Sequence, residues 1–148
     1  MVISVDCGVS AHDEARLARA LGLDLIITDH HQPPAVLPEA FAIVNPQLAD
    51  SRFPFRDLAG VGVAFFLLVA VRRCLREAGW FATRPEPDLK SVLDLVALGT
   101  IADLVPLHGE YRQLAHHRRV AEILKHGARP ALAVEQLRRA VAAADDDA

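Results

Sequence analysis

Three side chains able to bind a metal ion or exchange a proton stand together in LIITDHHQPP, residues 25–34. An apolar run ends there in Asp29, His30 and His31, and the two prolines that follow forbid a helix. Another acid, Asp6, ends the apolar run VISV near the start of the chain. Imidazole and carboxylate ligands together suit Mn²⁺, Zn²⁺ or Fe²⁺, and Mg²⁺ where oxygens dominate. These four side chains are the first candidates for a metal site.

A third acidic position, Asp103, lies in GTIADLVPL, residues 99–107. The helix expected from Lys90 is apolar on most sides, so we expect it to be buried, with Asp103 near its end in apolar surroundings. Burying a lone carboxylate is expensive unless a cation or hydrogen-bond donors compensate. Asp103 is therefore a further candidate ligand, and the alternative is a carboxylate at an exposed helix end.

The flanking patterns predict the elements that position these residues. We expect three strands, at residues 2–5, 25–27 and 41–44. A helix from Ser10 to about Leu21 should join the first two, with Ser10 as its cap, which would leave Asp6 free for another role. Strand, helix and strand in under thirty residues predict a parallel sheet buried on both faces. Ligands of such sheets bind beyond the carboxyl ends of the strands, and Asp6 and Asp29 end neighbouring strands that lie ~4.8 Å apart.

The rest of the chain has a helical pattern. Helices are expected at residues 61–78, 90–102, 110–125 and 130–142. The most apolar segment, residues 58–71, is shorter than the ~20 residues that a membrane-spanning helix needs, so we expect a buried helix and no membrane partner. The predicted fold class is α/β, a Rossmann-like parallel sheet with flanking helices, followed by an all-helical segment.

Composition narrows the function classes. The 148 residues are 52% hydrophobic, enough for one domain with a core. A net charge of -3 argues against a protein that coats nucleic acid by charge alone, so any contact with a polyanion would be local. One such contact could come from Arg112 and its basic neighbours, although basic runs are usually solvated faces. Cys7 and Cys74 form no CxxC pair and no signal peptide is visible, which favours a reducing cytoplasm.

Five segments, in this order, resemble the DHH phosphoesterase superfamily and, within it, its single-strand-specific exonucleases. VDCG, TDHH and GTIADLVPL resemble the second, third and fourth motifs of the superfamily; they occupy residues 5–8, 28–31 and 99–107. IVNPQ and LAGVGVAFFL, residues 43–47 and 58–67, resemble the exonuclease branch. The similarity runs from the first residue to about Lys125.

The resemblance implies a centre with two divalent metal ions, Mn²⁺ or Mg²⁺, that hydrolyses single-stranded DNA from 5′ to 3′ in DNA repair and recombination. It implies that Asp6 bridges the ions and that His30 and Asp103 are further ligands. His31 would face the scissile phosphate and Asp29 would orient the histidines. Two ions ~3.5–4 Å apart stabilise both the attacking and the leaving oxygen.

This chain also departs from the superfamily pattern. Relatives carry a first motif with two or more aspartates on a strand before VDCG, and they continue into further domains. The resemblance therefore predicts an interior piece, with a partial DHH domain at residues 1–108, a helical connector and acidic tail at residues 109–148, and no activity of its own. Tyr111 stands where relatives tend to have asparagine, which bears on the substrate contact of Arg112.

Two other functions fit the same residues. A DHH phosphatase acting on short oligonucleotides or small phosphate esters would share the metal motifs, and the exonuclease-like segment at residues 61–65 is the feature that discriminates against it. A non-catalytic scaffold or interaction module of the same fold is the second alternative. A loss of catalytic function is disfavoured by the retained Asp6, His30, His31 and Asp103. The absence of the first motif favours it.

Overall fold

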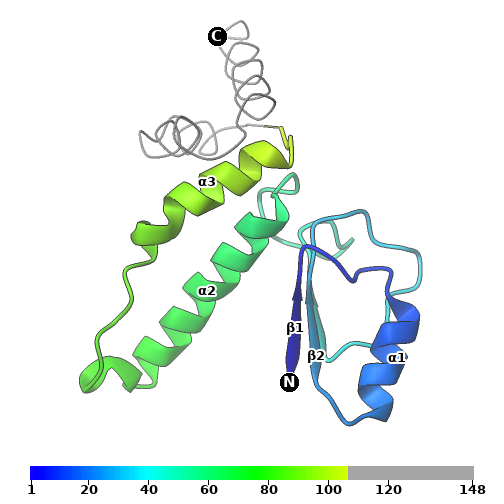
Figure 1. Cartoon of the computed structure of the whole chain (residues 1–148), viewed down its shortest axis with the longest axis horizontal. Coiled ribbons are helices and arrows are strands. Elements are labelled where there is room, and N and C mark those ends of the chain that lie inside the picture. The colour runs from blue at the N-terminus through cyan, green and yellow to red at the C-terminus, as the bar shows by residue number, and fades with distance from the viewer. Residues whose placement is uncertain (107–148) are drawn as a thin grey trace, which may run out of the picture. The chain divides into compact units, whose positions relative to one another are not determined.

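The structure is a computed structural model that describes residues 1–106. The chain divides into two compact units, Met1–Leu68 and Val69–Ala148. The first unit holds a small sheet and the helix that joins its first two strands (Figure 1). The helices expected after residue 107, the boundary expected at residue 108, and Arg112 lie outside the described residues.

The sheet has three parallel strands in the order β1-β2-β3. They are β1 (Val2–Val5), β2 (Leu25–Thr28) and β3 (Ala42–Val44). Val5 pairs with Thr28 and Thr28 pairs with Val44, so the three strands end at the same level. The predicted α/β class with a parallel sheet is confirmed.

Helix α1 (His12–Ala20) connects β1 to β2 and lies beside β2 (Figure 1). The prediction that Ser10 caps this helix is wrong, because the N-cap is Ala11 and no side chain caps the first turn. The Ala11 N–H donates to the Gly8 carbonyl and the His12 N–H donates to the Ser10 carbonyl. This tight turn moves Ser10 out of the cap position.

Burial differs between the strands. β2 is the central strand and its Ile27 is fully buried, as expected for a strand covered on both faces. β1 is at the edge of the sheet in the described part of the chain, and its Val2, Ile3 and Val5 are exposed. The predicted burial of the sheet on both faces therefore holds for β2 and fails for β1, which has a strand neighbour on one side.

Helix α2 (Gly60–Glu77) is buried at its start, around Leu58, Ala59 and Val63. The ring of Phe53 packs edge-on against Phe66, with centroids 4.9 Å apart, and ties the preceding loop to the helix. Further along, Phe66, Leu68 and Val71 are exposed and the other large apolar side chains are half-buried, so the prediction of a buried helix is correct only for the first turn. The helix is apolar around its circumference, and the neighbours in residues 1–106 cover its beginning. No helix within residues 1–106 is long and apolar enough to cross a membrane.

The described part of the second unit continues α2 and ends with helix α3 (Leu93–Ala102). Two short 3₁₀ turns lie between them, Trp80–Ala82 and Leu89–Val92. Arg76 forms an ion pair with Glu86, and Arg72 donates to the Pro87 carbonyl at 3.1 Å. These contacts attach the proline-containing linker to the last turns of α2.

A candidate metal centre

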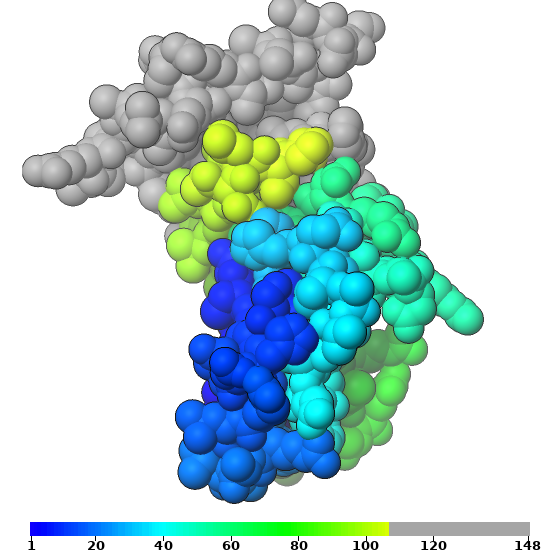
Figure 2. Space-filling model, turned by 90° about the vertical axis from the view of Figure 1, so that its right-hand side faces the viewer, coloured from blue at the N-terminus to red at the C-terminus, as the bar shows by residue number. Residues whose placement is uncertain are grey.

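The ends of β1 and β2 bring the candidate residues together. Asp6 follows β1 directly, and its N–H donates to the Thr28 carbonyl at 2.9 Å. Asp29 follows β2, and its N–H donates to the Val44 carbonyl at 3.0 Å. In the space-filling view, blue atoms of the N-terminal segment adjoin light-blue atoms of the segment that follows β2 (Figure 2). The strand ladder thus extends one residue past the sheet and positions both carboxylates at its carboxyl edge.

Asp6, His30 and His31 form a cluster that could hold a metal ion. His30 Nε2 lies 3.0 Å from Asp6 Oδ1. One potential ligand atom from each of the three residues lies within 4.8 Å of the others. The rings of His30 and His31 contact each other at a tilt, with centroids 4.4 Å apart. Two imidazoles and a carboxylate suit Mn²⁺, Zn²⁺ or Fe²⁺.

Asp29 lies beneath this cluster with only 1% of its surface exposed. Its Oδ2 accepts a hydrogen bond from the Val9 N–H at 2.8 Å. Its Oδ1 lies 2.7 Å from His31 Nδ1 and accepts from the N–H groups of His30 and His31. Burial by itself would raise the pKa of Asp29, but the hydrogen bonds from Val9, the His31 ring and the two backbone groups outweigh it and lower the pKa. The carboxylate is therefore ionised and can fix the His31 ring with Nδ1 as donor.

The backbone at Asp6 is unusual. Its φ of 64° is in the left-handed region, which costs non-glycine residues ~1–2 kcal/mol, although aspartate tolerates it better than most. The Thr28 hydroxyl donates to the Ser4 carbonyl at 2.7 Å, and the Ser4 hydroxyl donates to the Cys7 carbonyl at 2.9 Å. These bonds and the Asp6 N–H bond fix the turn after β1. The backbone conformation at Asp6 is thus set by the surrounding structure.

Asn45 is a supporting residue that the sequence indicated only as the end of the third strand and as part of IVNPQ. It is buried directly after β3, and its Nδ2 donates to the His31 carbonyl at 2.9 Å. Its Oδ1 accepts from the Gln47 N–H at 2.8 Å. Asn45 therefore joins the loop after β3 to the histidine loop. The signal available in the sequence was a polar residue directly after an apolar strand. If such an amide is buried, it must find hydrogen-bond partners, which indicates a structural role.

Asp103 lies at the end of α3, in the second unit. The prediction that it is buried in apolar surroundings is wrong, because Asp103 is exposed. Its N–H donates to the Gly99 carbonyl, and Leu104 then turns the chain with a φ of 55°. The helix therefore ends at this residue. Its role as a metal ligand remains a prediction that rests on the resemblance.

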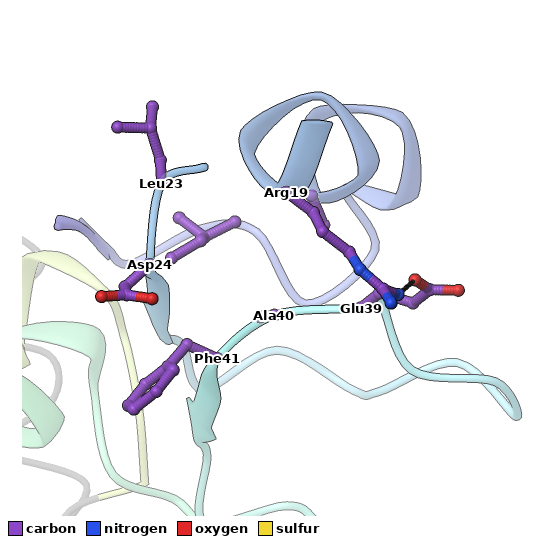
Figure 3. A pocket seen from close by; sticks show the side chains of 8 residues that line it. Arg19, Leu23, Asp24, Glu39, Ala40 and Phe41 are labelled. Atoms are coloured by element: carbon purple, nitrogen blue, oxygen red, sulfur yellow. Dashed lines mark hydrogen bonds and ion pairs between the residues drawn. The ribbon is translucent and has the colours of Figure 1, made fainter. Parts of the chain in front are cut away.

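The described part of the first unit includes hollows at both ends of the strands. One, of about 450 Å³, lies at the carboxyl edge and is lined by the turn after β1 together with Asp29 and His31. The other, of about 260 Å³, lies at the opposite end of the strands beside Phe41. There the side chains of Arg19 and Glu39 point toward each other and form an ion pair (Figure 3). Because those charges compensate each other, the carboxyl edge is the better candidate for chemistry.

The sheet and the cluster at its carboxyl edge agree with the sequence comparison. Residues 1–100 match the DHH family, N-terminal domain, and the chain belongs to this family. The match includes Asp6, His30 and His31, and it extends into α3 as far as Thr100.

Within the family, the chain is similar to the exonuclease RecJ. It is 52% identical over 116 residues to the single-stranded-DNA-specific exonuclease RecJ of Escherichia coli strain K12, covering 77% of this chain and 20% of that protein. A crystal structure of exonuclease RecJ bound to manganese is 32% identical, with a TM-score of 0.64, over 91% of this chain and 34% of the other. The crystal structure of RecJ from Thermus thermophilus in complex with Mn²⁺ is 33% identical, with a TM-score of 0.63, over 91% and 20%. The chain thus spans about a fifth of the curated relative's length.

Proposed function

We propose that this chain provides the metal-binding part of an exonuclease that hydrolyses phosphodiester bonds of single-stranded DNA. The observation that carries the proposal is the Asp6, His30 and His31 cluster, supported by buried Asp29, in a chain 52% identical to RecJ of Escherichia coli. The proposal includes 5′ to 3′ polarity and a role in DNA repair and recombination. Cys7 and Cys74 are both free, which fits a reducing cytoplasm.

The two histidines differ in exposure, and we assign their roles on that basis. The His30 side chain is 12% exposed and contacts Asp6, so Asp6 and His30 would hold the metal ion. The His31 side chain is 61% exposed and is oriented by Asp29, so its ring would face the phosphate of the substrate. A bound Mn²⁺ or Mg²⁺ would lower the pKa of a coordinated water and stabilise charge on the phosphate oxygens.

Asp29 has a separate task in this scheme. Its Oδ1 contacts the ring and backbone of His31, so it sets both the ring orientation and the loop that carries the ring. Removing a carboxylate that supports a metal-site histidine in this way typically lowers metal affinity or activity by about 10–100-fold. Asp29 is therefore proposed to act through the histidines.

Asp6 and His30 would hold one ion, with water completing its shell, and Asp103 stays the further ligand that the resemblance implies. A second ion would need additional carboxylates. Because one ion alone would have to activate the nucleophile and stabilise the leaving oxygen, we expect the isolated chain to bind metal without digesting DNA.

A chimera tests this function directly. In it, the matching segment of the Escherichia coli exonuclease is replaced by residues 1–100 of this chain. We expect the chimera with Mn²⁺ to release nucleotides from a labelled single strand, to leave duplex DNA intact, and to be blocked by a bulky 5′ end. His30→Ala should lower the rate by at least ~10²-fold, as loss of an electrostatic group in a catalytic site does. His12→Ala, outside the cluster, should leave the rate unchanged.

The same assay discriminates among the alternatives. A folded chimera that dephosphorylates short oligonucleotides but leaves long single strands intact would favour the phosphatase hypothesis. A folded chimera without either activity would favour a scaffold or interaction module.

A further inference from the structure

Gly60, the first residue of α2, lies against Asp6. A Cβ placed on Gly60 would lie 2.1 Å from Asp6 Oδ1, 2.5 Å from its Cγ and 2.7 Å from its Cβ. Real Cβ atoms essentially never approach another heavy atom within 3.0 Å. The first turn of α2 can therefore reach Asp6 only because residue 60 has no side chain.

Backbone conformation does not explain this glycine. Gly60 is part of a regular α-helix and is not among the residues with positive φ. Glycine in a helix is less favourable than alanine by ~1 kcal/mol. Glycine is thus explained at this position by the Asp6 carboxylate, which occupies the space that a side chain would need.

The oxygen that a Gly60 side chain would displace belongs to the cluster. Asp6 Oδ1 is the atom that lies 3.0 Å from His30 Nε2. Rotation of the Asp6 carboxylate would not relieve this contact, because the Asp6 Cβ would itself lie 2.7 Å away and the Asp6 N–H is bonded to the Thr28 carbonyl. The N-terminus of an 18-residue helix also carries a partial positive charge that favours a carboxylate nearby.

We propose that Gly60 is a positioning residue of the metal centre. It lets the start of α2 pack on Asp6 and thereby holds Oδ1 toward His30. The consequence for metal affinity rests on the function proposed above, whereas the placement of Asp6 by Gly60 does not depend on it.

Gly62 provides a matched control two residues further along the helix. A Cβ on Gly62 would meet Cδ1 of Leu58 at 2.6 Å and Cγ at 2.9 Å, so the contact there is with an apolar side chain and not with Asp6. Both glycines lie in the first turn of α2 and both are buried, so the two alanine substitutions are made in closely similar surroundings. The two substitutions differ in whether they touch Asp6.

The first measurement uses metal-free protein. NMR of the chain should show that Gly60→Ala shifts the signals of the Asp6 carboxyl carbon and the His30 ring nitrogens, while Gly62→Ala leaves them in place. Calorimetry with Mn²⁺ should show affinity lower by about 10–100-fold in Gly60→Ala and unchanged in Gly62→Ala. Unchanged Asp6 and His30 signals in Gly60→Ala would overturn the inference.

Two further outcomes are separable. If the unsubstituted chain binds no Mn²⁺, the proposed metal centre fails, while the NMR comparison still decides the role of Gly60. If Gly60→Ala does not fold, the double variant Asp6→Gly with Gly60→Ala should fold, because glycine tolerates a φ of 64° and removes all three clashing atoms. Failure of the double variant would contradict the inference, since the clash would then lie elsewhere.

Discussion

Asp29 combines near-complete burial with a lowered pKa, a pairing that requires dense hydrogen bonding. Its oxygens accept from three backbone N–H groups and lie against the ring of His31. Sequence reasoning assigned this residue to orienting the histidines through the resemblance alone. The contact with Val9, in the turn after β1, was not visible in the sequence because it joins residues twenty positions apart.

Asp29 should make stability depend on pH in acid. Its pKa in the folded chain lies below the ~3.9 of an unfolded aspartate, so the stabilisation is full above that pH and is lost as the pH falls through the folded pKa. Asp29→Asn should remove this dependence and lower the free energy of unfolding by ~1–3 kcal/mol at neutral pH, because an amide cannot accept all these bonds. Urea melts across acid pH would measure both, with the exposed Asp13→Asn as control. An unchanged acid slope in Asp29→Asn would contradict the assignment.

Other residues mark where prediction from sequence succeeds and fails. Asp6, His30 and His31 could be predicted because polar residues that end neighbouring parallel strands meet at one edge. Gly60 could be predicted to pack closely, but its partner Asp6 lies far away in the chain. The burial of Asp103 was predicted wrongly, since an apolar helix does not reveal where its last turn meets solvent.

At the scale of elements, the loops after β2 and β3 are joined by Asn45. Asn45→Ala should leave the His31 carbonyl and the Gln47 N–H without their partner and lower the free energy of unfolding by ~1–3 kcal/mol. Hydrogen exchange at His31 should accelerate, while exchange within β1 should stay unchanged. The exposed substitution Ser91→Ala, in the second unit, is a suitable control. Unchanged exchange at His31 would mean that Asn45 does not hold the loop.

β1 presents another property of an element. Its exposed apolar side chains at the sheet edge form a surface on which chains can pair. We expect concentration-dependent self-association in analytical ultracentrifugation, reduced by Ile3→Lys and not by Leu17→Lys, which changes an exposed residue of α1. If the chain stays monomeric at high concentration, β1 does not mediate self-association.

At the scale of the whole molecule, the sequence pattern predicted the parallel strands and the approximate bounds of the helices within residues 1–106, because periodicity and turn residues are local signals. α2 was expected at residues 61–78 and spans Gly60–Glu77. The exposure of β1 and of apolar residues such as Phe66 and Leu68 in the later turns of α2 could not be predicted, since burial depends on which neighbours cover each face.

The central claim is that Asp6 and His30 hold a metal ion at the carboxyl edge of the sheet. Calorimetric titration of the chain with Mn²⁺ tests it most directly, comparing the unsubstituted chain with Asp6→Ala, His30→Ala and the control His12→Ala. We predict one site per chain, lost in the first two variants and retained in the control. The same affinity in His30→Ala, or no binding by the unsubstituted chain, would contradict the account.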